Sequence, residues 1–274
     1  MPELPEVETI ARGLNRHLAG DGIRSVWLGS KPEPFKSPAQ EIAAALEAKT
    51  ISGVRRAGKH IVFELRSQEN GRRSPGKKLQ WIVHLGMTGS LRVYPGEAGI
   101  EKHTHAIVRL ASGRELRFVD PRRFGRLSVI ENFAAPGAEP LEISLQDFAA
   151  RFRNRRTPIK SALLNQKLLS GVGNIYADEA LYRAKIRPRR QASSLTRGEF
   201  GRLHRSLKQV LREAIRAGGS SISDYVDANG DEGLFQLEHR VYGREGQSCR
   251  VCKTRIRRTT IAGRSSHYCP HCQR

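Results

Sequence analysis

Four cysteines near the end of the sequence constrain the fold of this chain more than any other feature. They form two Cys-x2-Cys pairs, Cys249 with Cys252 and Cys269 with Cys272, which are separated by sixteen residues. This spacing is typical of a tetrahedral zinc site, in which each pair supplies two thiolates to one ion. Four thiolates leave no open coordination position, so the sequence predicts one structural Zn²⁺. A pair of redox motifs, or a histidine in place of one cysteine, is the alternative.

The segment that carries these cysteines is strongly basic. From Arg244 through Arg264 seven residues are basic, and Glu245 is the one acidic residue among them. The stretch between the two pairs has the length of a two-stranded hairpin with Gly263 at its turn. We therefore expect residues 236–274 to form a zinc ribbon whose hairpin faces phosphate groups.

The charge of the whole chain indicates the same kind of partner. Its 274 residues include 48 Lys and Arg against 27 Asp and Glu, a net charge of +21. Such an excess opposes a compact state unless a polyanion binds, and nucleic acid is the first candidate. No basic amphipathic helix and no run of about 20 apolar residues indicates a membrane. Residues 1–10 lack the apolar region of a secretory signal, so we expect a cytoplasmic protein with reduced cysteines.

Hydropathy patterns divide the rest of the chain into two regions. Residues 5–19 have apolar side chains at helical spacing, and another helix-like stretch lies near residue 40. Eight short strand-like runs lie between Ile23 and Ile130, which is typical of an antiparallel sandwich or barrel. The polar stretch 67–78 is expected to be an exposed loop between two of these strands.

After the Pro and Gly cluster at 134–140, the apolar period changes to 3.6 residues. We expect helices at 145–153, 159–169, 175–184 and 196–217. The predicted fold class is α+β, with an N-terminal antiparallel β-sandwich flanked by helices at 1–133. A helical domain at 134–235 and the zinc ribbon at 236–274 would follow.

Three further motifs accompany the cysteine pairs. The chain begins MPELPEVET, continues through Asp120-Pro-Arg-Arg-Phe-Gly125, and later contains Gly171-Val-Gly-Asn-Ile-Tyr176. Pro and Glu at the start of a chain also suit an ordinary helix N-terminus. In this order, however, the motifs and the zinc ribbon closely resemble bacterial formamidopyrimidine-DNA glycosylases over the whole chain. The resemblance implies a helix-two-turn-helix around residues 171–174 of the helical domain.

The resemblance also implies a reaction. The family is a bifunctional DNA glycosylase and abasic-site lyase that excises oxidised purines, such as 8-oxoguanine and formamidopyrimidines, from double-stranded DNA. By this resemblance Met1 is removed and the amine of Pro2 attacks the sugar C1′, which gives a Schiff-base (iminium) ion and then β- and δ-elimination. An α-amine suits this role because its pKa of about 8 lies far below that of lysine. Glu3 would be the general acid/base, while Glu6 would orient the amine or simply partner the helix dipole.

Other family positions imply contacts with DNA. Lys59 matches a lysine that grips a phosphate beside the lesion, and Arg264 matches an arginine at the tip of the zinc hairpin. Met87, Arg122 and Phe124 match the side chains that fill the gap when a nucleotide is flipped out. As isolated apolar residues, Met87 and Phe124 would also suit a hydrophobic core. The other DNA-binding residues implied by the resemblance are His103, Lys160, Asn174 and Tyr242.

The polar stretch from Gly218 to Gly233 resembles the family loop that closes over the flipped base. The alternative is a flexible linker. By resemblance the partner is double-stranded DNA with oxidised bases or abasic sites, and the protein is a bacterial monomer that associates with the nucleoid while it acts. The predicted lesion-pocket residues are Glu6, Ser220, Ser221, Ile222 and Tyr225.

Two rival functions follow from the same sequence. One is an endonuclease VIII-type glycosylase for oxidised pyrimidines, and the other is a zinc-containing DNA-binding protein without catalysis. The Glu-Leu-Pro-Glu start and the set of Met87, Arg122 and Phe124 favour the purine enzyme. Borohydride trapping separates an enzyme from a binding protein, because an iminium ion with DNA becomes a covalent adduct when it is reduced.

Overall fold

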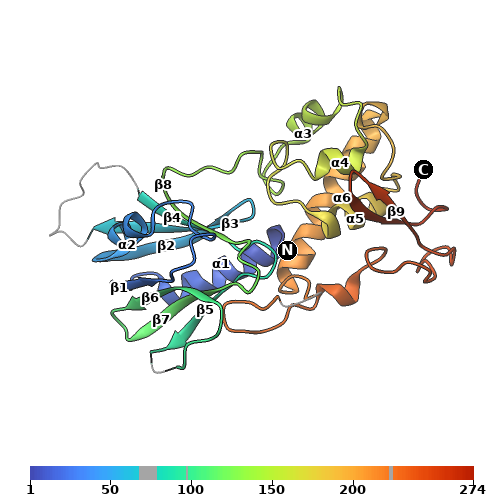
Figure 1. Cartoon of the computed structure of the whole chain (residues 1–274). Helices are drawn as coiled ribbons and strands as arrows, with labels where there is room; N and C mark the ends of the chain where they lie inside the picture. The colour runs from blue at the N-terminus through green and yellow to red at the C-terminus, as the bar shows by residue number, and fades with distance from the viewer. Residues whose placement is uncertain (68–78, 97, 222–224) are drawn as a thin grey trace. The chain divides into compact units, whose positions relative to one another are not determined.

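The computed structural model describes residues 1–67, 79–96, 98–221 and 225–274. The chain folds into two compact units (Figure 1). Unit 1 comprises Met1–Ala134 together with Ser220–Gly233, and unit 2 comprises Ala135–Gly219 together with Leu234–Arg274. The sequence-based division instead placed residues 220–233 with the helical domain. They join unit 1 because Ala228 is buried in its core and Ser220 bonds to its first helix.

Unit 1 contains two four-stranded sheets in which all neighbouring strands are antiparallel. Each strand overlaps one of the eight strand-like runs of the sequence, and antiparallel pairing in a fixed register joins the strands of each sheet. The first sheet has the order β1 (Ile23–Leu28), β6 (Thr104–Leu110), β7 (Arg114–Val119) and β5 (Ser90–Pro95). The second has the order β2 (Lys49–Ala57), β3 (His60–Ser67), β4 (Leu79–His84) and β8 (Arg126–Glu131).

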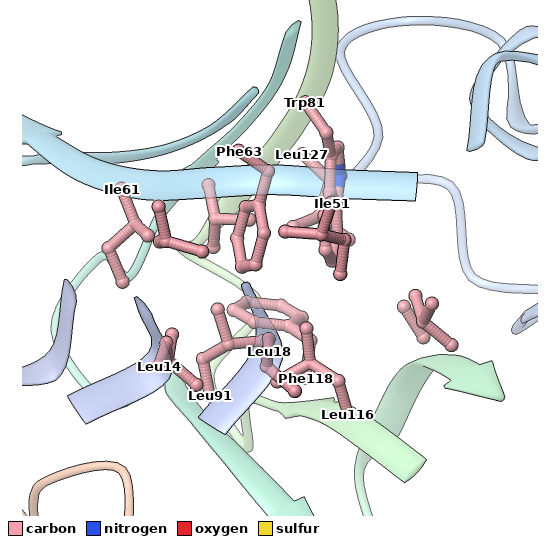
Figure 2. Close-up of a cluster of buried hydrophobic side chains, with 14 of the residues drawn as sticks. Leu14, Leu18, Ile51, Ile61, Phe63, Trp81, Leu91, Leu116, Phe118 and Leu127 are labelled. Atoms are coloured by element: carbon pink, nitrogen blue, oxygen red, sulfur yellow. The ribbon is translucent and has the colours of Figure 1, made fainter. Parts of the chain in front are cut away.

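The core of unit 1 lies between the two sheets. Figure 2 shows Ile61, Phe63 and Trp81 of the second sheet facing Leu91 and Phe118 of the first. Two helices, α1 (Leu4–Leu18) and α2 (Ala39–Leu46), add their apolar faces to the same core. The predicted β-sandwich flanked by helices is therefore confirmed, and its stability comes from the burial of these large side chains.

Unit 2 is mainly helical, and its zinc ribbon ends in a hairpin. The hairpin pairs β9 (Arg257–Ile261) with β10 (Arg264–Tyr268) in antiparallel register, with Gly263 in its turn as the sequence predicted. The longest described helix, α6 (Arg197–Arg216), begins with a capping box in which Thr196 accepts from the Glu199 amide and Glu199 accepts from the Thr196 amide. The elements are α3 (Leu145–Phe152), α4 (Ile159–Leu163), α5 (Asn174–Arg183), η1 (Ala192–Ser194), α6 (Arg197–Arg216), η2 (Phe235–Glu238), β9 (Arg257–Ile261) and β10 (Arg264–Tyr268).

One predicted helix is much shorter than expected. The sequence predicted a helix over 159–169, but α4 ends at Leu163. Asn165 explains the difference, because its side-chain oxygen accepts from the Lys167 amide at 3.0 Å and its carbonyl accepts from the Leu168 amide at 2.9 Å. Asn competes in this way with the helical hydrogen-bond pattern, and the apolar period cannot reveal it.

Two predictions fall on residues outside the described part of the chain. The proposed exposed loop at 67–78 lies outside it except for Ser67, which ends β3. Ile222, one of the predicted lesion-pocket residues, also lies outside it.

Candidate functional site

The beginning of the chain is anchored inside unit 1 by the carboxylate of Glu6. Glu6 Oε2 accepts from the Glu3 amide at 2.8 Å, and Glu6 Oε1 accepts from the Ser220 amide at 2.8 Å. The hydroxyl of Tyr225 donates to the Glu6 carbonyl at 3.4 Å. One buried side chain thus connects the start of α1 with the 220–233 segment, although they are more than 200 residues apart in sequence. The bond to the Glu3 amide belongs to the capping box of α1, whereas a helix N-terminus does not require the bond to the Ser220 amide.

The two acidic residues that the sequence singled out are both enclosed. Glu3 is 4% exposed and Glu6 is 2% exposed, whereas Pro2 is half-buried. Lys59, which follows Gly58 in the turn between β2 and β3, is 8% exposed. The structure thus brings Pro2, Glu3, Glu6 and Lys59 into unit 1, with the carboxylates more enclosed than Pro2.

An amine at this end of the chain is biased toward its neutral form. Burial lowers the pKa of the Met1 amine, and the charges of Lys59 and Arg122 lower it further, while Glu3 and Glu6 act to raise it. A lower pKa means a larger neutral fraction at pH 7, and a neutral amine is a nucleophile. An amine at the neighbouring Pro2 position would experience the same group of charges.

Met87 and Phe124 do not belong to the core. Met87 is 45% exposed and Phe124 is 51% exposed, so the core alternative is wrong for both. The guanidinium of Arg122 lies over the Phe124 ring with 4.7 Å between Cζ and the ring centroid. His103, in the turn before β6, is exposed and has a φ of 69°. The chain therefore presents an exposed Met, Arg, Phe and His from unit 1.

The four cysteines of unit 2 converge on one point. The Sγ atoms of Cys249 and Cys272 are 3.9 Å apart, those of Cys252 and Cys269 are 3.4 Å apart, and all four lie within 4.8 Å of one another. A tetrahedral zinc site with Zn–S bonds of about 2.3 Å separates its sulfurs by about 3.8 Å. The four thiols therefore fit a single structural zinc, as the spacing predicted.

Lys160 occupies a different environment from the one that the sequence suggested. Its side chain is 0% exposed, and Nζ lies 2.6 Å from Asp178 Oδ1 and donates to the Ser265 carbonyl. The buried side chain of Lys160 thus links α4 to α5 and β10. The DNA-binding role implied by the resemblance therefore does not match this environment, in which Asp178 and the Ser265 carbonyl take up the ammonium.

The remaining predicted residues of unit 2 lie around the same hairpin. Arg264 is exposed at the hairpin turn, directly after Gly263. Asn174, the first residue of α5, donates from Nδ2 to Ser265 Oγ at 3.2 Å. Tyr242 packs its ring edge-on against His267 with 5.1 Å between ring centroids. Asn174 thus contacts the residue that follows Arg264 in the hairpin.

Sequence reasoning missed two buried carboxylates in α5. Asp178 accepts from the His267 amide at 2.8 Å, and Glu179 accepts from the amides of Arg240, Val241 and Tyr242. Both side chains have 0% exposure. Burial raises the pKa of Glu179, and its three amide donors oppose that increase. The available signal was their position between apolar neighbours on both sides in Ile175-Tyr-Ala-Asp-Glu-Ala-Leu181.

These features define a class of protein. A neutral-biased amine beside enclosed carboxylates is equipped for nucleophilic and acid/base chemistry, and a strongly basic chain directs such chemistry to a polyanion. The molecule is thus of the class of nucleic-acid enzymes that carry a structural zinc. No helix among the described residues combines the length and apolar character that a membrane crossing requires.

Comparisons with known proteins give the family. Models described as the formamidopyrimidine-DNA glycosylase N-terminal domain, the formamidopyrimidine-DNA glycosylase H2TH domain and the zinc finger found in FPG and IleRS match residues 1–127, 135–226 and 246–274. A formamidopyrimidine-DNA glycosylase of Solibacter usitatus is 45% identical, and one of Herpetosiphon aurantiacus is 42% identical, each over the full length of both chains. This chain belongs to the formamidopyrimidine-DNA glycosylase family.

Solved structures agree with that assignment. A mutant FPG of Lactococcus lactis in complex with Fapy-dG-containing DNA has a TM-score of 0.89 at 34% identity, with full coverage of both chains. The MutM (FPG) protein of Thermus thermophilus has a TM-score of 0.85 at 40% identity, and the match covers 99% of this chain and 98% of the other. The described fold is therefore that of the family as a whole.

Proposed function

We propose that this protein is a bifunctional DNA glycosylase and abasic-site lyase of base excision repair, which removes 8-oxoguanine and formamidopyrimidines from double-stranded DNA. The observation that carries the proposal is the double hydrogen bonding of Glu6, whose carboxylate holds the Glu3 amide and the Ser220 amide at 2.8 Å each. This arrangement joins the end of the chain that would carry the nucleophile to the segment that would enclose a base. A protein that merely binds DNA has no need of such a junction.

The proposed nucleophile is the secondary amine of Pro2 after removal of Met1. Its nitrogen attacks C1′ of the damaged nucleotide, the bond between C1′ and the base breaks, and the base leaves with the bonding electrons and a proton. Glu3 is placed to supply a proton to the departing group or the sugar ring oxygen. The amine then loses its proton and the C1′–O4′ bond opens, with a proton going to the ring oxygen, which gives an iminium ion. This ion acidifies the proton on C2′, so β-elimination expels the 3′ phosphate and δ-elimination the 5′ phosphate.

The lowered pKa of the chain-end amine supports this assignment. Desolvation, together with Lys59 and Arg122, favours the uncharged amine in this part of unit 1. A lower pKa leaves a larger fraction of an amine neutral, and therefore nucleophilic, at pH 7. Lys59, enclosed in the same unit, is proposed to hold a phosphate next to the lesion.

Base excision requires that the damaged nucleotide leave the helical stack, which costs a few kcal/mol of stacking and pairing. We assign the filling of the gap to Met87, Arg122 and Phe124, since all three are exposed and the Arg122 guanidinium lies over the Phe124 ring. Flexible Met and planar Phe suit insertion between bases, and Arg suits hydrogen bonding to the unpaired base.

The proposed substrate class follows from the relatives and from charge. The Lactococcus lactis proteins were captured with DNA containing Fapy-dG or an abasic site. The net charge of +21 and the exposed Arg264 beside the start of α5 suit a duplex with its dense phosphate charge. The site of action would be the bacterial nucleoid.

Borohydride trapping tests the proposal. The purified protein is mixed with an 8-oxoguanine duplex and reduced, and the covalent adduct is digested for mass spectrometry. We expect the sugar remnant on the nitrogen of Pro2 and a protein mass that lacks Met1. A remnant on Lys59 would show that the nucleophile is wrong, and a protein with no adduct on any lesion would be a binding protein only.

Single-turnover excision decides the substrate class. Matched duplexes carry 8-oxoguanine opposite cytosine or thymine glycol opposite adenine, and the undamaged duplex is the control. We expect the purine lesion to be removed faster. Faster removal of thymine glycol would instead identify an endonuclease VIII-type enzyme.

A further inference from the structure

The turns that carry Met87 and Phe124 are joined by a buried residue that has no role in the chemistry described so far. We propose that Asp120 is a positioning residue, which locks the Met87 turn and the Arg122–Phe124 turn into one rigid element and so controls insertion into the DNA. The proposal rests on the gap-filling role given to Met87, Arg122 and Phe124 above. It adds to that role a residue that touches neither DNA nor the reacting atoms.

The carboxylate of Asp120 bonds to both turns at once. Asp120 Oδ1 accepts from the Thr88 hydroxyl at 2.6 Å, which fixes the residue next to Met87. The same oxygen accepts from the Arg122 amide at 3.2 Å, and Oδ2 accepts from the Gly125 amide at 2.7 Å. Both ends of the Arg122–Phe124 turn are thereby held by one side chain, whose exposure is 0%.

The backbones of the two turns are also in direct contact. Gly86 has a φ of 66°, and a Cβ atom on it would lie 2.5 Å from the Phe124 carbonyl carbon and 2.6 Å from the Gly125 nitrogen. A Cβ atom on Gly125 would lie 2.4 Å from the Phe118 ring. These distances are too short for any side chain, so the turns approach as closely as two backbones can. The Asp120 side chain spans the junction by hydrogen bonds to both turns.

The backbone of Asp120 is fixed as well. Its amide donates to the His103 carbonyl at 3.0 Å, and its carbonyl lies 2.9 Å from Nε2 of the buried His105. The turn that presents His103 is therefore tied to the same residue. An anchor whose own backbone is held in this way cannot follow the movement of either turn, and it must instead restrain them.

Rigidity of this kind matters for an inserting side chain. Met87 and Phe124 are about half exposed and contribute little to any core, so the apolar packing of unit 1 does not fix where they point. Their placement must come from the turns beneath them. A turn that moves would lose ordering entropy each time its side chain enters the stack, and pre-ordered turns avoid that loss.

The cleanest test changes Thr88, since its hydroxyl is the cross-link between the turns. Thr88→Val keeps the shape and removes the bond to Asp120, whereas Thr88→Ser keeps the hydroxyl and serves as the matched control. Asp120→Asn keeps the volume but puts a donor where one of the bonds needs an acceptor. Thermal unfolding followed by tryptophan fluorescence identifies any variant that has lost its fold.

Two measurements are made on each variant. Stopped-flow fluorescence of 2-aminopurine beside 8-oxoguanine follows insertion, and borohydride trapping on a preformed abasic site follows the chemistry. For Thr88→Val we expect insertion to slow about tenfold, the size expected when one hydrogen bond to a charged acceptor is lost. Trapping should stay within about twofold of wild type because Pro2 and Glu3 are untouched, and Thr88→Ser should behave like wild type.

Three outcomes would overturn the inference. Insertion by Thr88→Val at the wild-type rate would show that the cross-link is unnecessary. Equal losses of insertion and trapping would show general damage to unit 1, and failure of Thr88→Ser to restore insertion would show that the hydroxyl is not the relevant group. Failure of the wild-type protein to trap abasic DNA would instead refute the proposed function, and the two failures are therefore distinguishable.

Discussion

The sandwich of unit 1 and the zinc ribbon of unit 2 hold exposed functional residues by different means. Unit 1 has a core of large apolar side chains between two sheets, and its exposed residues sit on turns at the edges of that core. The ribbon packs its cysteines against three apolar side chains, those of Tyr182, Val241 and Ile256. A segment this small cannot bury enough surface to fix its own shape, so metal ligation replaces a core there.

Both units nevertheless use buried carboxylates in the same way. Buried carboxylates accept backbone amides from irregular segments that lie between the regular elements. In unit 1 Glu6 holds the 220–233 segment and Asp120 holds the Arg122–Phe124 turn, whereas in unit 2 Glu179 holds residues 240–242. Apolar burial therefore decides where strands and helices go, whereas the functional loops are held by buried carboxylates in addition to single apolar residues such as Ala228 and Val241.

The largest expected effect is loss of the metal. Cys269→Ala removes one of four thiolates, so we expect no stoichiometric zinc, an unfolded ribbon and no measurable binding to lesion DNA. The two tryptophans, Trp27 and Trp81, are both in unit 1, and their fluorescence should be unchanged. Zinc content, DNA binding and tryptophan emission are measured on the same sample. A large change in emission would show that the core of unit 1 depends on the zinc ribbon of unit 2.

Substitutions in the apolar cores should destabilise one unit and leave the other unchanged. Phe63 packs against Trp81 in unit 1, and Phe148 packs against Phe152 in unit 2, and both phenylalanines are fully buried. Replacement of either by Ala should lower the free energy of unfolding of its own unit by about 3–5 kcal/mol. Phe63→Ala should shift the tryptophan-detected transition and leave zinc bound.

Phe148→Ala is the matched control for that experiment. It should leave the tryptophan-detected transition of unit 1 in place and lower the denaturant concentration at which zinc is released. Equal shifts of both signals by either variant would mean that the units unfold as one.

The contrast also explains how far the sequence could predict this structure. Strands such as β1 and β6 were predictable as short apolar runs bounded by turn residues, and α1 because its apolar residues recur at helical spacing. The zinc centre was predictable because ligand spacing alone defines it. The end of α4 was not, because a single Asn side chain decides it.

Polar anchors were the part that the sequence could not reveal. Charged residues such as Lys160 and Asp178 normally lie on a helix surface. Their burial depends on contacts with β10, which lies 105 residues after Lys160 and 89 residues after Asp178 at the bonded positions. The return of residues 220–233 to unit 1 depends on the buried Ala228 and on the Ser220 amide, and neither an alanine nor a backbone amide stands out in a sequence. The family motif drew attention to Asp120, but its hydrogen bonds to both turns follow only from the fold.

A substitution in unit 1 should also remove the chemistry without removing DNA binding. Glu3→Gln keeps the size of the side chain and removes its acid/base function, so we expect excision of 8-oxoguanine to fall by about 100-fold or more. Binding to abasic-site DNA should change by less than about threefold, since it depends on surface cations such as Arg264. Single-turnover excision and a binding titration measure the two effects. Equal losses in both would place Glu3 in DNA binding.

The smallest expected effect concerns acid stability. Burial lowers the pKa of His84 to about 4, with further lowering by His60, Arg126 and Lys59, whereas an unfolded histidine titrates near 6.5. The unfolded state therefore takes up a proton first as the pH falls. The stability that neutral His84 contributes is present above about pH 6.5, is lost between 6.5 and 4, and changes no further below that range.

His84→Asn tests this pH dependence, because the Asn side chain can still accept the Gly86 amide that His84 Nδ1 accepts at 3.2 Å. We expect similar stability at pH 7.5 and a weaker dependence of the tryptophan-detected transition on pH between 6.5 and 4.5. Burial also lowers the pKa of His60, so the dependence should weaken without disappearing. Zinc release from unit 2, which responds to thiolate protonation, should keep its own pH dependence. If the slope for unit 1 is unchanged in the variant, the acid sensitivity of the sandwich does not originate at His84.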